Sequence, residues 1–462
     1  MANSLAWLQL LSPWLWPSIF SMLCFLVAMS RRVSAFVFYP LGILFSMYSL
    51  WMLRPVFPTL VLRCLSYDYL FFILALALGV FYLAIGLMSY RSLRQAESWG
   101  LLLLIFLSSL LVLAAANLLL LFIALEMFFL LSVLWVSFFH QGGQVSAMPV
   151  RLFLTGAFAS AFTLFGMSFL YGVGASLSIA DIGYWAGRST SFVYGYGLML
   201  FLAGILFKLS AVPFHHWTAE VYEDSPPPML GLLAAVSKLM GVAVLIKIFY
   251  HFPIPRDILA VLAALSMLVG NLGALVQTRV KRLLAFSSIA HVGFLLMGFA
   301  SGSVSGFQAV LTYMLYYGLS VLALLALLML LRSGDGELTD YDGLAQRHPG
   351  LAALLSFLLL SLAGLPPTVG FLAKWKIIEA SFQVGQYWLV GVAVLSSVIG
   401  AAYYATWVFR LFAKTGGAAF WQEEKNLPIF VLTLALFLIL ALSSLFPQAL
   451  LDLGPLVTGG ML

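Results

Sequence analysis

Long apolar segments separated by short polar ones run through almost the whole chain. An α-helix rises about 1.5 Å per residue, so about 20 apolar residues are enough to cross the hydrocarbon of a bilayer. By this measure the sequence predicts about fourteen membrane-spanning helices. Their approximate bounds are 5–29, 33–53, 69–90, 99–115, 117–139, 150–174, 193–217, 229–250, 257–277, 282–300, 306–331, 350–380, 386–412 and 428–451. We therefore predict an all-α polytopic membrane protein.

The composition supports lipid as the solvent of this chain. Hydrophobic residues make up 63% of it and charged residues only 8%, whereas soluble domains carry about 25% charged residues. The formal net charge of +6 is spread over many loops, which indicates membrane topology and not nucleic-acid binding. The two cysteines, Cys24 and Cys64, fit no metal site or disulfide framework.

Lys and Arg are unevenly distributed among the predicted loops, and cytoplasmic loops carry the excess of such residues. Loops after even-numbered spans hold Arg54, Arg63, Arg188 and Arg256. Loops after odd-numbered spans hold Arg31, Arg32, Arg91, Arg94, Arg279, Lys281, Arg282, Arg332, Arg347, Arg410, Lys414 and Lys425. This bias places the odd-numbered loops in the cytoplasm and both termini outside. The loop after the seventh span is an exception, with Glu220, Glu223 and Asp224.

Two predicted spans are interrupted by prolines, which remove a helix hydrogen bond and clash with the preceding turn. The seventh reads FKLSAVPFHHW with Pro213, and the twelfth reads LSLAGLPPTVGFLAKW with Pro366 and Pro367. Broken helices in corresponding positions indicate an ion site in an inverted-repeat transporter. Ordinary kinks would explain the prolines but not the lysine near each break.

The spacing of the two broken helices predicts two inverted five-helix repeats, formed by helices 4–8 and 9–13. We expect a single transmembrane domain over 1–462. Its expected parts are three N-terminal helices in 1–98, a first repeat in 99–250, a second repeat in 257–412 and a C-terminal helix at 428–451.

Several ionisable residues fall near the middle of predicted spans, where a charge costs about 2.5–3.5 kcal/mol. They are Glu126, Lys208, Lys238, His291 and Lys374. One buried Glu–Lys pair would serve equally well to pin two helices, but several such groups at one depth favour a proton relay. Lys247, Lys376 and Glu379 lie near span ends, where we expect them to reach the membrane interface.

Four stretches resemble the subunit N family, the antiporter-like membrane subunits of bacterial NADH:quinone oxidoreductase (respiratory complex I). They are RLFLTGAFASAFTLFGMSFLYG (151–172), FKLSAVPFHHWTAEVYEDSPPP (207–228), RLLAFSSIAHVGFLLMG (282–298) and YDGLAQRHPGLAALLSFLLLSLAGLPPTVGFLAKW (341–375). With the helix count, the resemblance covers most of residues 100–412.

The resemblance implies a role for each mid-membrane residue. Glu126 matches the fifth-helix glutamate of the family and Lys208 the seventh-helix lysine that pairs with it. Lys238 matches the eighth-helix lysine, His291 the central histidine and Lys374 the twelfth-helix lysine. The implied order of proton transfer is Lys208, Lys238, His291 and then Lys374. Arg151 departs from the family, which usually has a lysine there; arginine stays protonated, so the resemblance does not decide whether Arg151 takes part in the relay.

The family further implies a proton-translocating subunit in a bacterial inner membrane, assembled with other membrane subunits of complex I. The sequence has no recognisable flavin, iron–sulfur or quinone site, so we expect no redox centre here and FMN, iron–sulfur clusters and quinone in other subunits. A sodium/proton antiporter subunit of the Mrp type, or the membrane subunit of a hydrogenase- or ferredoxin-linked complex, remains an alternative. A substrate transporter of another fold and a purely structural anchor are the remaining classes.

Overall fold

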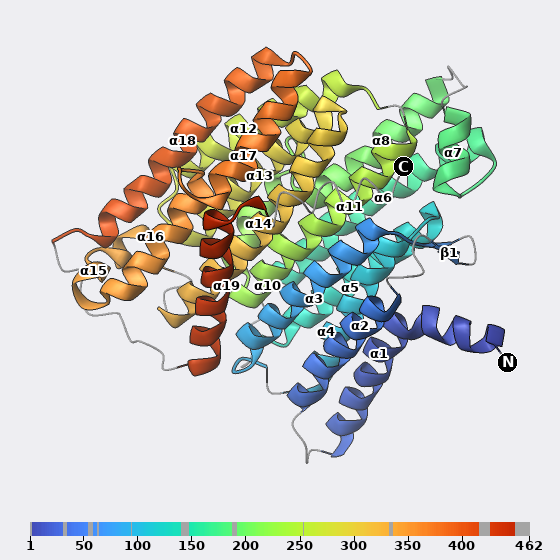
Figure 1. Ribbon diagram of the computed structural model, residues 1–462, viewed down its shortest axis with the longest axis horizontal. Coiled ribbons are helices and arrows are strands. Elements are labelled where there is room, and N and C mark those ends of the chain that lie inside the picture. The colour runs from blue at the N-terminus through green and yellow to red at the C-terminus, as the bar shows by residue number, and fades with distance from the viewer. Residues whose placement is uncertain are drawn as a thin grey trace. The chain divides into compact units, whose positions relative to one another are not determined.

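The computed structural model describes residues 2–30, 35–53, 59–61, 64–93, 95–139, 147–186, 192–252, 254–331, 336–414 and 426–448. These residues are helical almost throughout (Figure 1). Two short strands, β1 (Thr59–Val61) and β2 (Leu65–Tyr67), form an antiparallel hairpin in which Thr59 pairs with Tyr67. The predicted all-α class is therefore confirmed.

The described residues form two compact units. Unit 1 holds the described residues through Ile205 together with Ala243 to Phe252, and unit 2 holds Leu206–Val242 and the described residues from Ile254 onward. The division passes through the seventh and eighth predicted spans. The predicted division into two repeats stays a prediction.

Unit 1 is a helical bundle in which α1 packs on α2 and α4, α4 on α5, and α5 on α6. A small residue allows close approach at Gly166 of α6, because a Cβ atom there would clash with the backbone of Phe201. The elements that begin in this unit are α1 (Ala2–Ser30), η1 (Ala35–Val37), α2 (Phe38–Leu53), α3 (Tyr69–Ser89), α4 (Ala96–Ala114), α5 (Leu118–Ser137), α6 (Met148–Gly174), α7 (Ile179–Ala186) and α8 (Phe192–Leu209).

Unit 2 is built around α13 and α14, which are buried along most of their length. α12 packs along α13, and α17 and α19 pack along α14. The elements that begin in this unit are α9 (His216–Asp224), α10 (Pro227–Gly231), η3 (Leu232–Val236, a π-helical turn), α11 (Ser237–His251), α12 (Arg256–Leu275), α13 (Val280–Ser301), α14 (Val304–Leu330), η4 (Leu338–Tyr341), α15 (Leu344–Arg347), α16 (Pro349–Ala363), α17 (Val369–Gln383), α18 (Tyr387–Leu411) and α19 (Leu427–Leu445).

Within the described residues, which leave out 33–34 and 449–451, each predicted span overlaps one helix or a run of consecutive helical elements. Among the described residues, twelve helices are long and apolar enough to cross a membrane. The two other predicted spans are α2, which has 16 residues, and the pair α16 and α17, which have 15 residues each. The polytopic membrane architecture is confirmed, whereas the count of fourteen and the inverted repeats stay predictions.

Candidate functional site

One face of α13 carries the centre of the candidate site. Ser288, His291 and Phe294 follow one another at intervals of three residues, so they share a helix face. The Nζ atom of Lys238 on α11 donates a hydrogen bond of 2.8 Å to the carbonyl of Ser288. The Nζ of Lys374 on α17 lies 5.2 Å from the ring centre of Phe294. All three ionisable residues are buried, and both lysines are close enough to His291 to interact with it electrostatically.

Tyrosines of α14 complete the surroundings of His291. The Nδ1 atom of His291 lies 2.5 Å from the hydroxyl of Tyr313, and its ring centre lies 4.7 Å from that of Tyr317. The Tyr317 ring also faces Lys238, whose Nζ lies 5.3 Å from the ring centre. Sequence reasoning missed these tyrosines because it considered charged groups alone. Their spacing in TYMLYYG (312–318), which places both on one helix face, was the available signal.

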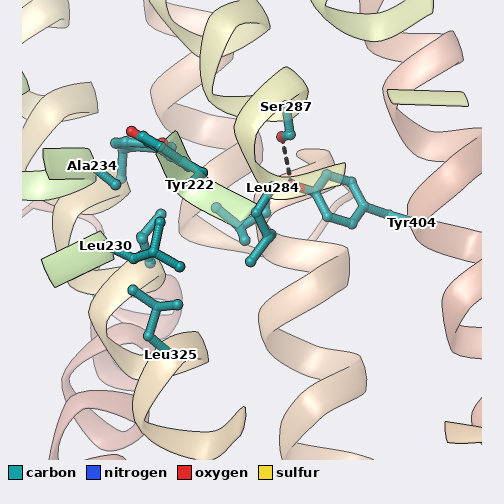
Figure 2. A pocket seen from close by; sticks show the side chains of 10 residues that line it. Tyr222, Leu230, Ala234, Leu284, Ser287, Leu325 and Tyr404 are labelled. Carbon is teal, nitrogen blue, oxygen red and sulfur yellow. Dashed lines mark hydrogen bonds between the residues drawn. The ribbon is translucent and has the colours of Figure 1, made fainter. Parts of the chain in front are cut away.

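A small cavity adjoins this row. It has about 20 Å³ of room for the centres of water molecules, and about 10–15 Å³ is enough for one. Its polar lining comes from four side chains: Tyr222, Ser287, Tyr317 and Tyr404. Figure 2 shows the Tyr404 hydroxyl directed at Ser287, with the two oxygens 2.6 Å apart. Since Tyr317 faces both the cavity and Lys238, a water here would lie next to the buried row.

Lys374 also closes the break between α16 and α17. α16 ends at Ala363, and Gly364 adopts a left-handed conformation with φ +80°. The amides of Gly364 and Leu365 donate back to the carbonyls of the preceding turn. The Nζ of Lys374 donates to the next two carbonyls, those of Leu362 at 3.1 Å and Ala363 at 2.7 Å. The last carbonyls of α16 are thus bonded without water.

The break between α8 and α9 is closed differently. α8 ends at Leu209, and Ser210 takes the left-handed conformation with φ +65°. The indole Nε1 of Trp217 donates to the carbonyl of Phe207 at 3.2 Å, and the amide of Val212 donates to Ser266 Oγ at 3.0 Å.

Both breaks coincide with the predicted prolines. The peptide bonds Val212–Pro213 and Pro366–Pro367 are cis. Lys208 lies in the last turn of α8, before its break. Lys374 lies within α17, after its break.

Glu126 lies on α5 in unit 1, where it accepts a hydrogen bond from the hydroxyl of Ser160 on α6. Lys208 belongs to unit 2, so its predicted pairing with Glu126 stays a prediction. Glu126 and Lys208 are both half-buried, unlike the three residues along α13.

The acidic segment that stood out among the loops belongs to α9 and not to a loop. Its Glu223 forms ion pairs with Arg279 and, at 3.5 Å, with Arg282. Lys281 is buried in the first turn of α13 and donates to the carbonyl of Ser225 at 2.7 Å, just beyond the end of α9. Basic residues at the start of α13 therefore compensate the acidic end of α9.

The three residues that we expected at the interface differ from one another. Lys376 and Glu379 form a 2.9 Å ion pair, with 44% and 38% of their side chains exposed. Lys247, by contrast, donates to the backbone carbonyls of Leu113 and Ala115. No pattern in the sequence indicates this second arrangement, because the acceptors are backbone atoms more than a hundred residues away.

Residues 115–400 match the family model described as NADH:quinone oxidoreductase/Mrp antiporter, TM. The chain belongs to this family. The matched segment includes both helix breaks and the five predicted relay residues. The family resemblance predicted from the sequence is thereby confirmed.

A curated relative supports the same placement within the family. NADH-quinone oxidoreductase subunit N of Hirschia baltica is 39% identical over 307 residues, which cover 65% of this chain and 64% of that protein. The matched part of the chain thus spans just under two thirds of that relative's length.

Two solved structures share the fold. A chain of respiratory complex I from Thermus thermophilus with bound aureothin is 28% identical, with a TM-score of 0.84 over 95% of this chain and 98% of that one. A chain of the Mrp complex from Dietzia is 18% identical, with a TM-score of 0.86 over 96% of each chain. The second likeness concerns the fold alone.

Proposed function

We propose that this chain is a proton-translocating membrane subunit of an NADH:quinone oxidoreductase (respiratory complex I) in a bacterial inner membrane. The observation that carries the proposal is the buried row Lys238, His291 and Lys374 along one face of α13. Ionisable residues at this depth are costly, and they mark proton or ion pathways. Kinship to subunit N at 39% identity supports the assignment.

The row works by keeping each proton-binding atom next to neutral partners. Lys238 donates to a backbone carbonyl, and His291 shares a short contact with the Tyr313 hydroxyl. A neutral partner stabilises the protonated form of Lys238 or His291 less than a carboxylate would, so the proton can leave again. Like charges repel strongly where water is scarce, so a proton that arrives on one member of the row favours release from the next. In the proposed order, this repulsion passes a proton from Lys238 through His291 to Lys374.

Both ends of the row need contact with water. At the Lys238 end, the cavity lined by Tyr317, Ser287, Tyr222 and Tyr404 offers room for a water. At the other end, Lys374 lies at the break between α16 and α17, where the backbone is not helical. We assign to the first the water that passes a proton on to Lys238, and to the second the release of the proton.

In the proposed order, Glu126 and Lys208 act upstream of this row. A carboxylate stabilises the charged form of a lysine beside it, so approach of Glu126 would hold a proton on Lys208 and withdrawal would release it toward Lys238. The driving force comes from redox chemistry in other subunits, which would carry the FMN, iron–sulfur clusters and quinone, and it reaches this chain by electrostatic or conformational coupling.

The test measures protons pumped per NADH oxidised in vesicles that contain the intact complex. We expect Lys238→Met to abolish most pumping, while Lys376→Met, which removes an exposed lysine, leaves it unchanged. Normal pumping in the Lys238→Met complex would contradict the proposal.

An Mrp-type sodium/proton antiporter subunit is the second candidate, supported by the shared fold. It differs from the first by its cation and its partners. If the chain purifies without flavin and iron–sulfur subunits, and if its proton transport requires sodium, the antiporter assignment replaces the first one.

A further inference from the structure

The junction between α4 and α5 is an interruption of helix inside unit 1. α4 ends at Ala114, Ala115 is extended, and the side chain of Asn117 caps α5 by accepting from the amide of Leu119 at 2.8 Å. Such an interruption frees backbone groups, which in a membrane must find partners in the protein or in water.

Neighbouring segments of unit 1 satisfy much of this backbone. The amide of Ala116 donates to the carbonyl of Cys64 at 2.8 Å, and the carbonyl of Ala116 accepts from Ile179 at 3.1 Å. Isolated bridges join Leu65 to Ala115 and Asn117 to Ser178. The junction is therefore held between the hairpin end and the start of α7.

Lys247 supplies the charged part of this arrangement. Its Nζ donates to the carbonyl of Leu113 and, at 2.9 Å, to that of Ala115. These carbonyls lie at the carboxyl end of α4, where the helix dipole favours a cation. Asp68, which caps α3, and His251, one turn along α11, are close enough to interact electrostatically with Lys247. A lysine that merely reached the interface would show no such pair of acceptors.

The junction bears directly on Glu126. α5 starts at Leu118, immediately after the junction, and Glu126 lies nine residues beyond Asn117 on the same helix. The helix is rigid over that distance, so the position of its first turn fixes the depth and direction of the Glu126 side chain. On the other side, Glu126 is held by Ser160.

We propose that Lys247 is a positioning residue for Glu126, which it places by holding the α4–α5 junction closed. The proposal rests on the proposed function for its effect on pumping, but the closed junction can be tested without it. Lys247 transfers no proton in this scheme. Its charge strengthens two hydrogen bonds to backbone carbonyls, since bonds with a charged partner are about twice as strong as neutral ones.

Cys64 provides a built-in reporter of the junction. It is partly exposed, and its carbonyl accepts from Ala116. The other cysteine, Cys24, is fully buried. In the intact complex we would measure the rate at which N-ethylmaleimide modifies Cys64, by mass spectrometry of the peptide that contains it.

We expect Lys247→Met to raise this rate by about tenfold, the change that loss of one or two charge-assisted hydrogen bonds produces. Lys247→Arg keeps the donors and the charge, so it should restore the slow rate. Lys376→Met is the matched control and should have no effect. A rate in Lys247→Met equal to that of the natural complex would overturn the proposal.

Measurements of proton pumping distinguish a positioning role of Lys247 from general damage to the complex. If Lys247 acts through Glu126, then Lys247→Met should lower pumping several-fold, and adding it to Glu126→Gln should lower pumping no further than Glu126→Gln alone. Additive losses would overturn the positioning role. If Glu126→Gln itself pumps normally, the proposed function of Glu126 fails, while the Cys64 rates still decide whether Lys247 holds the junction.

Discussion

The two helix breaks of unit 2 look alike in sequence and differ in how their carbonyls are bonded. At each, a left-handed residue, Ser210 or Gly364, is followed three residues later by proline. The first break is closed by neutral groups, among them the indole of Trp217. The second is closed by an ionisable group, the Nζ atom of Lys374, which reaches back from the following helix.

A lysine of the proposed row can therefore also close a helix break, as Lys374 does at the second one. Lys374 is both a proton-binding residue of the proposed row and the donor that satisfies the end of α16. At the first break, the carbonyl of Phe207 accepts from the indole of Trp217, and Lys208 precedes the break by two residues. We therefore expect loss of the proton site and loss of stability to coincide at the second break.

The largest effect is expected from Lys374→Met. It removes a proton site and leaves the carbonyls of Leu362 and Ala363 without their donor, and an unsatisfied buried acceptor costs about 1–3 kcal/mol. We expect pumping per NADH to be lost and the thermal unfolding temperature of the purified complex to fall. Lys208→Met, which leaves the bond from Trp217 to the Phe207 carbonyl in place, should lose pumping with a smaller fall in that temperature. Equal destabilisation by both variants would contradict the comparison.

Gly364→Ala should come next. A left-handed conformation costs a non-glycine residue about 1–2 kcal/mol, and a Cβ here would lie 2.7 Å from Cδ of Lys374. The lysine must therefore shift from its carbonyls, so we expect both lower pumping and lower thermal stability. Full pumping by this variant in vesicles would show that pumping does not require the hydrogen bonds from Lys374 to the end of α16.

Trp217→Phe tests the neutral closure of the first break. The phenyl ring keeps the aromatic packing against Phe207, whose ring centre lies 6.3 Å from that of Trp217, but loses the indole donor. A typical hydrogen bond contributes about 1 kcal/mol, so we expect a modest fall in thermal stability and pumping close to normal. A severe loss of pumping would indicate that the first break has a functional donor after all.

The smallest effect is expected from Ser210→Gly. Ser210 already adopts φ +65°, a conformation that glycine reaches at no steric cost. We expect unchanged pumping and a small gain, at most, in the unfolding temperature. A clear loss in either measurement would mean that the Ser210 side chain matters, and that the two breaks differ less than their backbone suggests.

Sequence alone located the breaks because proline acts locally. Pro213, Pro366 and Pro367 disturb hydrogen bonds of their own helices, so a single stretch contains the information. The burial of Lys238 and His291 was predictable for a similar reason, since a long apolar run around an ionisable residue places it deep in the membrane.

What sequence could not show are partners that lie far along the chain and carry no charge. Lys247 bonds to backbone carbonyls of α4, and every residue type offers the same carbonyl. Tyr313 meets His291 through the packing of α13 against α14, which residue patterns in either helix leave undetermined. For the same reason the sequence indicated only a relay role for Lys374, whereas its Nζ atom also donates to the last carbonyl of α16.

The hydrogen bonds of Lys374 have a mechanical consequence under the proposed mechanism. A charged donor holds its acceptors about twice as tightly as a neutral one, so the joint between α16 and α17 is stiff while Lys374 carries its proton and compliant once the proton has left. Each proton transfer thus changes the rigidity of the joint between α16 and α17. Protonation of a single nitrogen atom is in this way coupled to the relative motion of two helices.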